Sequence, residues 1–306
     1  MEMKVEKHVF PGSSQDYYRS YLIEDSEELH HGMKRPAVIV CPGGGYVFLS
    51  DREDEPVALT FLSMGCQAFS LHYSIGDPAE GGKNKVLPEA LKELAKLVAE
   101  IKKNADEWMI DRDRIFIIGF SAGAHLCASY SGLWHTDWLS GAAGAKAKEL
   151  EIAACVLLYP VIDCEVIYEI MEKHGQSWDE ERKVVDEMAI AMSGEKHPSK
   201  KGVYYPEYDG RAIYYPATYV SEKNPPTFIA HAADDYFIYV ENTISFISAL
   251  SASRVSYETH IFEKGGHGFS LANPVTSNIP AERNKRTAGW VSLLRGWLTS
   301  RGILDR

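Results

Sequence analysis

A serine stands between two glycines in the run Gly-Phe-Ser-Ala-Gly at residues 119–123. A hydroxyl can attack a carbonyl only if the chain lifts it out of the fold, and a tight strand-to-helix turn does this. Glycines two positions before and after Ser121 remove the Cβ atoms that would collide in such a turn. A mostly apolar run, 114–118, precedes the motif, and an alanine-rich helical stretch follows it. We therefore predict that Ser121 is a nucleophile; the alternative is an ordinary turn with an incidental serine.

A histidine with glycine neighbours is the candidate general base. His267 lies in Gly-Gly-His-Gly-Phe at residues 265–269, directly after the strand-like segment 255–262. A base must reach the serine from a loop at the carboxyl end of the sheet, and this position suits that role. Of the competitors, His125 follows the serine by one turn and is expected to be structural, and His231 lies beside the candidate acid. The remaining histidines that we considered are in polar stretches and expected to be solvated: His30, His31, His174 and His197.

The acid of such a triad is expected between the serine and the histidine, at the end of a strand. Asp234 and Asp235 follow the strand-like run 227–230 and satisfy both conditions. The spacing of Asp235 to the apolar residues after it favours Asp235, and its neighbour is expected to cap the following helix. Asp163 also ends a strand, but it is the weaker alternative because an insertion follows it.

A glycine loop follows an earlier strand. The apolar run 37–40 leads into Cys-Pro-Gly-Gly-Gly-Tyr, in which the glycines are Gly43, Gly44 and Gly45. Attack on a carbonyl places negative charge on its oxygen, and loss of one N–H donor to that oxygen typically costs about 3 kcal/mol. Three glycines let the backbone approach a substrate closely. We predict an oxyanion loop; a flexible turn is the alternative, and a phosphate loop is disfavoured because no Gly-Lys-Ser/Thr follows.

Strand-like and helix-like segments alternate along the chain. Strands are expected at 5–10, 18–24, 37–40, 67–73, 114–118, 152–159, 227–230 and 255–262, and helices at 87–103, after Ser121, at 240–252 and at 284–299. This alternation is typical of an α/β fold with a mostly parallel central sheet and helices on both faces. Residues 164–219 break the rhythm and are predicted to be a cap insertion within a single domain, 1–306.

Composition excludes several classes of partner. The 306 residues carry a formal charge of −11, which disfavours nucleic acid and anionic membranes. The five cysteines are widely spaced and indicate reduced core residues rather than disulfides or a zinc site. No run approaches a membrane span and the first residues are charged, so we expect a cytoplasmic protein. The histidines show no metal-ligand spacing, and we expect neither a metal nor a cofactor. The expected partner is a small-molecule ester, and a homo-oligomer is allowed.

In these motifs the chain resembles the α/β-hydrolase esterases, in particular a bacterial branch of acetyl-xylan esterase-like and lipase/esterase-like proteins. The likeness covers about residues 35–270 and includes four motifs in the family's order, at 42–46, 119–126, 225–235 and 265–268. The resemblance implies a triad of Ser121, Asp235 and His267. It also implies an oxyanion hole made by the N–H of Ala122 with one or two N–H groups from the three glycines. The lipase-like branch has His before these glycines, whereas this chain has Pro42, which leaves open which glycine N–H takes part.

The expected function is therefore a serine carboxylesterase acting on short-acyl esters, principally acetyl esters of sugars or xylo-oligosaccharides. Tyrosines at 204–208 and 214–215, with Trp178, are either a stacking surface for sugar rings or packing for the cap. Two other functions compete. A peptidase of the prolyl-oligopeptidase type shares the order of the triad, and a non-catalytic binding protein could use the same scaffold.

Overall fold

The computed structural model describes residues 2–10, 16–28, 31–77, 79, 86–174, 179–196 and 213–304. Within these ranges eight strands form one sheet in the order β1-β2-β4-β3-β5-β6-β7-β8. Their bounds are Met3–Val9 (β1), Tyr17–Ile23 (β2), Arg35–Cys41 (β3), Gln67–His72 (β4), Ile110–Phe120 (β5), Ala154–Leu158 (β6), Thr227–Ala232 (β7) and Tyr257–Phe262 (β8). β1, β2 and β4 pair antiparallel, and the strands from β4 through β3 to β8 pair parallel. The predicted mostly parallel sheet is confirmed.

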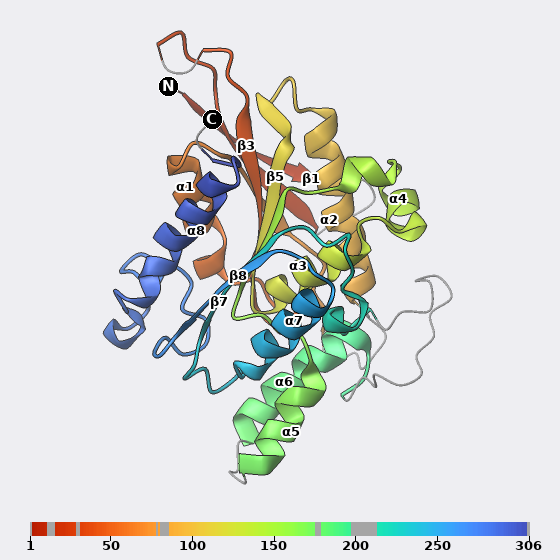
Figure 1. Cartoon of the computed structure of the whole chain (residues 1–306), viewed down its shortest axis with the longest axis vertical. Coiled ribbons are helices and arrows are strands. Elements are labelled where there is room, and N and C mark those ends of the chain that lie inside the picture. The colour runs from red at the N-terminus through yellow and green to blue at the C-terminus, as the bar shows by residue number, and fades with distance from the viewer. Residues whose placement is uncertain are drawn as a thin grey trace.

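Helices cover both faces of the sheet, as predicted (Figure 1). Their bounds are Glu55–Ser63 (α1), Val86–Lys103 (α2), Ala122–Leu133 (α3), Asp137–Ala143 (α4), Cys164–His174 (α5), Asp179–Ser193 (α6), Glu241–Ala252 (α7) and Trp290–Ser300 (α8). Helices α1 and α8 share one buried apolar cluster with one face of the strands, while α2, α3 and α7 belong to the cluster on the other face. The two clusters are the two cores of a three-layer architecture.

Helix α2 shows why the sequence folds this way. Its apolar residues recur at three- and four-residue steps, so they form one stripe along the helix. Those that we singled out in the sequence are fully buried: Leu91, Leu94, Ala95, Val98 and Ile101. The strands between the two helical layers are apolar on both faces instead, because both faces are covered. In β3, for example, every residue from Pro36 to Cys41 is buried.

The carboxyl ends of four parallel strands lead into the four predicted motifs. β3 ends at the glycine loop, β5 at Ser121, β7 at the two aspartates, and β8 at the loop that carries His267. In open α/β sheets ligands bind outside the carboxyl ends of the strands. The parallel pairing of these strands therefore gathers the motifs at one edge of the sheet.

The predicted insertion, residues 164–219, lies between β6 and β7 and contains α5 and α6. In Figure 1 these two helices lie together beyond α7, at one end of the molecule. Of the aromatic residues expected there, Trp178, Tyr204, Tyr205 and Tyr208 lie outside the described residues. Tyr214 and Tyr215 are described and are buried in the core, so these two pack rather than present a stacking surface.

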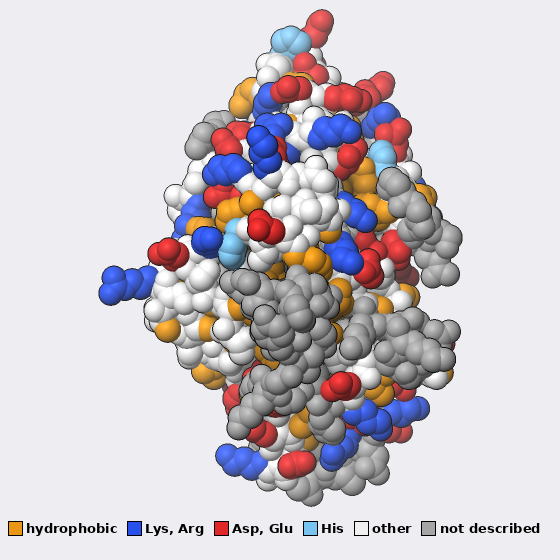
Figure 2. All heavy atoms as spheres, turned by 90° about the vertical axis from the view of Figure 1, so that its right-hand side faces the viewer, with side chains coloured by type: hydrophobic (Ala, Val, Ile, Leu, Met, Phe, Trp, Pro, Cys, Tyr) orange, Lys and Arg blue, Asp and Glu red, His pale blue; other side chains and the backbone are white. Residues whose placement is uncertain are grey.

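The state of the cysteines and the distribution of surface charge agree with what the composition predicts. All five cysteines are free and buried, as predicted. Figure 2 shows Lys and Arg side chains lying among Asp and Glu side chains on one face, rather than gathered into a basic patch. Among the helices of the described ranges, none has the length and apolar character needed to cross a bilayer.

Candidate active site

Ser121 lies on a strained turn between β5 and α3. Its φ is +50° and its ψ is −114°, a conformation that costs a non-glycine residue about 1–3 kcal/mol and is held only by its surroundings. Its N–H donates to the carbonyl oxygen of Leu158 at 3.0 Å. A Cβ at Gly119 would lie 2.2 Å from the oxygen of Gly123, and one at Gly123 would lie 2.1 Å from the oxygen of Cys41. Both positions therefore require glycine, as the motif predicted.

The loop that carries His267 is held by Asp234. Oδ1 of Asp234 accepts the N–H groups of Gly265 at 2.8 Å and Gly266 at 2.9 Å. The prediction that Asp234 caps the following helix is wrong, because its carboxylate turns toward the loop after β8 instead. The N–H groups two and three residues after Asp235, those of Phe237 and Ile238, donate to its Oδ1.

Ser121, His267 and Asp235 lie in one hydrogen-bonded series. Oγ of Ser121 is 2.9 Å from Nε2 of His267, and Nδ1 of His267 is 2.8 Å from Oδ2 of Asp235. Since a carboxylate only accepts, Nδ1 carries the ring proton, and Nε2 is left to accept the proton of the hydroxyl. The imidazole is thus in the tautomer that a general base requires. These residues are up to 146 positions apart in the sequence, and the fold brings them together.

Burial and charge act together on the site. Burial would raise the pKa of the Asp235 carboxyl, but the facing imidazoles of His267 and His231 hold it well below its usual value. Burial alone would lower the pKa of His267. The charge and hydrogen bond of Asp235, with a further contribution from Glu53, overcome this and raise the pKa of His267 above 6.5. The carboxylate therefore stabilises the imidazolium that forms when Nε2 takes up a proton.

The glycine loop turns sharply beside Ser121. The carbonyl oxygen of Gly44 accepts the N–H groups of Val47 and Phe48, and Gly44 and Gly45 have φ values of +123° and +63°. The N–H of Gly43 donates to Oε2 of Glu53 at 2.8 Å, so this donor, one of those predicted for the oxyanion hole, is already engaged.

The other predicted N–H donors are not engaged in this way. Within the described residues no hydrogen bond is made by the N–H groups of Gly44, Gly45 and Ala122. The last of these is the first residue of α3, where a backbone N–H has no partner inside the helix. These three of the predicted donors are therefore unengaged within the described part of the chain.

Sequence reasoning missed Glu53 and Tyr159. Glu53 is 4% exposed, and the hydroxyl of Tyr159 donates to its Oε1 at 2.6 Å. The ring of Tyr159 lies edge-on to His267, with 5.2 Å between ring centroids. Glu53 belongs to the charged run 50–55, which is typical of a solvated surface, and nothing in the sequence marks it as buried.

The competing side chains have structural roles. His125 is buried, accepts the hydroxyl of Tyr46 at 2.8 Å and donates to the carbonyl of Tyr214 at 3.0 Å, and burial lowers its pKa to about 4. It is structural, as predicted. Oδ1 of Asp163 accepts the N–H groups at the start of α5. His31 is exposed and pairs with Asp25, while His30 and His197 lie outside the described residues.

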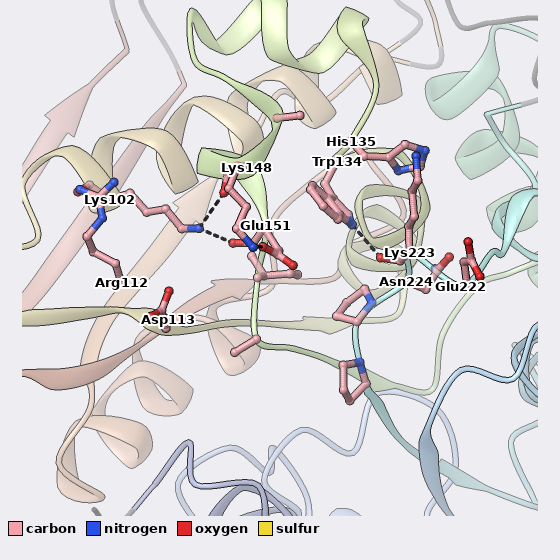
Figure 3. A pocket seen from close by; sticks show the side chains of 15 residues that line it. Lys102, Arg112, Asp113, Trp134, His135, Lys148, Glu151, Glu222, Lys223 and Asn224 are labelled. Atoms are coloured by element: carbon pink, nitrogen blue, oxygen red, sulfur yellow. Dashed lines mark hydrogen bonds and ion pairs between the residues drawn. The ribbon is translucent and has the colours of Figure 1, made fainter.

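A cavity of about 790 Å³ lies at the end of the parallel strands opposite to Ser121 (Figure 3). Its lining includes the residues just before β6 and β7, so it opens at the amino ends of the parallel strands. Nζ of Lys102 points to the carbonyl oxygens of Lys148 and Glu151, and the indole N–H of Trp134 donates to the carbonyl of Lys223. These polar groups pair with the backbone around the cavity, and Ser121 does not line it.

No group of three or more His, Cys, Asp or Glu side chains in the described ranges is arranged to hold a metal ion. The hydrogen-bonded series of Ser121, His267 and Asp235 lies wholly within the described residues. The chemistry that this series can perform is proton removal from a hydroxyl with attack on an electrophilic carbon.

Comparison with known proteins places the chain in a family. Endo-1,4-beta-xylanase B of Butyrivibrio fibrisolvens is 27% identical over 248 residues, covering 79% of this chain and 33% of that protein. The acetylxylan esterase of Xylanibacter ruminicola is 26% identical over 239 residues, covering 77% and 41%. The chain spans from about a third to just over half of the length of the curated relatives it matches.

Among solved structures, the carboxylesterase Cest-2923 from Lactobacillus plantarum superposes over the whole of both chains with a TM-score of 0.78 at 24% identity, which shows a shared fold. The predicted α/β-hydrolase fold is confirmed, and the similar proteins bear the names of esterases and other hydrolases. The BD-FAE family model matches residues 27–250, well over half of the chain. The chain therefore belongs to the BD-FAE family.

Proposed function

We propose that the chain is a serine carboxylesterase that hydrolyses short-acyl esters, principally acetyl esters of sugars or xylo-oligosaccharides. The observation that carries the proposal is the series of two hydrogen bonds, 2.9 Å and 2.8 Å long, that joins Ser121 to Asp235 through His267. The names of the xylanase and acetylxylan esterase relatives support the sugar ester as substrate.

In this mechanism Nε2 of His267 removes the proton of the Ser121 hydroxyl as Oγ attacks the ester carbonyl. The carbonyl oxygen becomes an oxyanion, which the N–H groups of Gly44, Gly45 and Ala122 stabilise. The tetrahedral intermediate collapses, the bond to the alcohol breaks, and His267 gives its proton to the departing alcohol. A water molecule then loses a proton to His267, attacks the acyl-enzyme and releases the acid.

The roles of the insertion follow from its position. We propose that residues 164–219, of which the structure describes 164–174, 179–196 and 213–219, form a cap insertion within a single domain, 1–306. The support is that α6 reaches the glycine loop: a Cβ at Gly45 would lie 3.6 Å from Cβ of Met188. The cytoplasmic location and the homo-oligomer remain predictions.

Turnover of 4-nitrophenyl esters of increasing chain length tests the acyl preference. We expect kcat/KM to be highest for acetate and to fall by about 10-fold or more toward chains of about eight carbons, because a site that fits an acetyl group excludes longer chains. Acetate release from acetylated xylo-oligosaccharides, measured beside an acyl-peptide substrate, tests the alcohol side. A preference for long chains or for the peptide contradicts the proposal.

A further inference from the structure

Glu53 is a buried carboxylate that the reaction above does not use. It ends the short 3-10 helix Asp51–Glu53, which begins five residues after Tyr46 of the glycine loop. Both of its oxygens accept a hydrogen bond, Oε2 from the N–H of Gly43 at 2.8 Å and Oε1 from the hydroxyl of Tyr159 at 2.6 Å. Removing a carboxylate from water is costly unless such partners are present, so a buried Glu53 calls for a specific role.

On one side Glu53 fixes the start of the glycine loop. The peptide group between Pro42 and Gly43 is held at both ends, because its N–H donates to Glu53 and its carbonyl oxygen accepts the hydroxyl of Tyr73 at 2.6 Å. A peptide group held at both ends cannot rotate. It adjoins the peptide group that carries the N–H of Gly44, which is proposed to meet the oxyanion, so fixing the first group narrows the orientations open to the second.

On the other side Glu53 reaches the loop of the histidine through Tyr159. The hydroxyl of Tyr159 accepts the N–H of Ser270 at 3.0 Å while it donates to Glu53. Tyr159 has a φ of +37°, a strained value for a non-glycine residue. Ser270 stands three residues after His267, so this contact ties the histidine loop to the same carboxylate.

Arg52, the neighbour of Glu53, makes the second tie to that loop. Its guanidinium donates to the carbonyl oxygen of Gly268 at 3.0 Å, and its own carbonyl oxygen accepts the hydroxyl of Ser270 at 2.6 Å. Residues 52 and 53 thus contact the histidine loop at two positions and the glycine loop at one.

The charge of Glu53 also bears on the histidine. The titratable and charged groups around Glu53 are Tyr159, Tyr73, Arg52 and His267. Burial raises the pKa of the Glu53 carboxyl above its usual value, and the two hydrogen bonds and the charges of His267 and Arg52 offset only part of this rise. Around His267 the corresponding groups are Asp235 and Glu53, and both raise its pKa. The imidazolium formed during the reaction would therefore be stabilised by two carboxylates. Asp235 contacts it directly, and Glu53 holds the hydroxyl of Tyr159, whose ring packs edge-on against His267.

We propose that Glu53 is a positioning residue for the esterase reaction. It holds the oxyanion loop and the histidine loop in a fixed mutual arrangement, and its negative charge stabilises the imidazolium of His267. The inference rests on the proposed function and extends it to a side chain that touches neither the substrate nor the reacting atoms.

The variant Glu53→Gln tests both parts of the inference, because it keeps the size of the side chain and removes the charge. We expect kcat for 4-nitrophenyl acetate to fall by about 100-fold with little change in KM, as for a displaced catalytic group. The acid limb of the kcat/KM profile should move to lower pH, because an imidazolium with one carboxylate fewer loses its proton more readily. Asp51→Asn is the matched control: it removes the same charge from an exposed position in the same short helix and should change neither quantity.

The variant Tyr159→Phe removes the hydroxyl that joins Ser270 to Glu53 but leaves Glu53 in place. It tests the positioning role if Glu53→Gln does not fold. We expect it to lower kcat by about 10-fold, the equivalent of one hydrogen bond. Wild-type values of kcat in a folded Glu53→Gln or in Tyr159→Phe, or an equal shift of the acid limb in Asp51→Asn, overturn the inference. If the wild-type protein neither turns over esters nor reacts with a fluorophosphonate, the proposed function itself fails, which is a distinct result.

Discussion

His231 and His267 face the same oxygen of Asp235. Nε2 of His231 lies 3.1 Å from Oδ2, and Nδ1 of His267 lies 2.8 Å from it. Nε2 of His231 also lies 2.8 Å from the carbonyl oxygen of Ile238. Two acceptors at one ring nitrogen require that this nitrogen carries the proton, so His231 donates toward the carboxylate. Asp235 is thereby held by a second, fully buried imidazole besides that of His267.

Replacing His231 should impair catalysis without removing any reacting group. His231→Leu removes a hydrogen bond to a charged group, and we expect kcat to fall by about 10- to 100-fold. Asp235 without this donor attracts the imidazolium of His267 more strongly, so the acid limb should move to higher pH, opposite to the shift expected for Glu53→Gln. His231→Gln retains an N–H at a similar distance from the backbone and should recover much of the activity. An unchanged acid limb in the leucine variant would show that His231 serves packing alone.

The two aspartates should differ sharply in their effect. Asp235→Asn presents an N–H to Nδ1 of His267 and forces the wrong tautomer, so we expect kcat to fall by about 10⁴-fold. Asp234→Asn keeps an oxygen that can accept the N–H groups of Gly265 and Gly266, and the loss should stay within about 10-fold. Steady-state kinetics of the two variants on one acetyl ester measures the difference. Equal losses would mean that the acid has been assigned to the wrong residue.

The pH dependence of kcat/KM should report the protonation of His267. Only the neutral imidazole accepts the proton of Ser121, and Asp235 raises the pKa of His267 above 6.5. Activity should therefore fall as pH decreases, with an apparent pKa above 6.5, in a profile recorded between about pH 5 and pH 9. In Asp235→Asn the limb should move downward, because the carboxylate that stabilises the imidazolium is gone. A limb well below 6.5 in the wild type would contradict the described hydrogen bond.

Glu93 offers a test of stability that is independent of catalysis. This carboxyl on α2 accepts the N–H and the hydroxyl of Ser74, and burial raises its pKa from 4.5 to about 7. Its protonated form thus stabilises the fold below pH 4.5, and this contribution is lost as pH rises through about 7. Glu93→Gln stays neutral, so at pH values above 7 it should raise the free energy of unfolding by up to about 3 kcal/mol, with no gain below pH 4.5. Urea unfolding at several pH values measures this; a constant difference would exclude a titration of Glu93.

The sequence predicts those parts of the site that depend on local geometry. The turn at Ser121 needs glycine two positions to either side, and this requirement is visible in five residues. The role of Asp234 depends on hydrogen bonds to Gly265 and Gly266, which are 31 and 32 positions away in the sequence. Local sequence does not reveal such contacts, and the predicted role of Asp234 as a helix cap was therefore wrong. Glu53 and Tyr159 are 106 positions apart in the sequence and form a hydrogen bond in the fold. In the sequence Glu53 is one member of a charged run and Tyr159 stands at the end of a strand, so neither is marked as part of the site.

The reaction of Ser121 with a fluorophosphonate tests the central claim most directly. The account predicts that the intact protein gains one phosphonyl group, that peptide mass spectrometry locates it on Ser121, and that ester turnover disappears in step with the labelling. Ser121→Ala should not be labelled, and His267→Ala should be labelled at least about 10³-fold more slowly, because the serine has lost its base. Turnover of acetyl esters that persists in Ser121→Ala, or a label on another residue, would contradict the account.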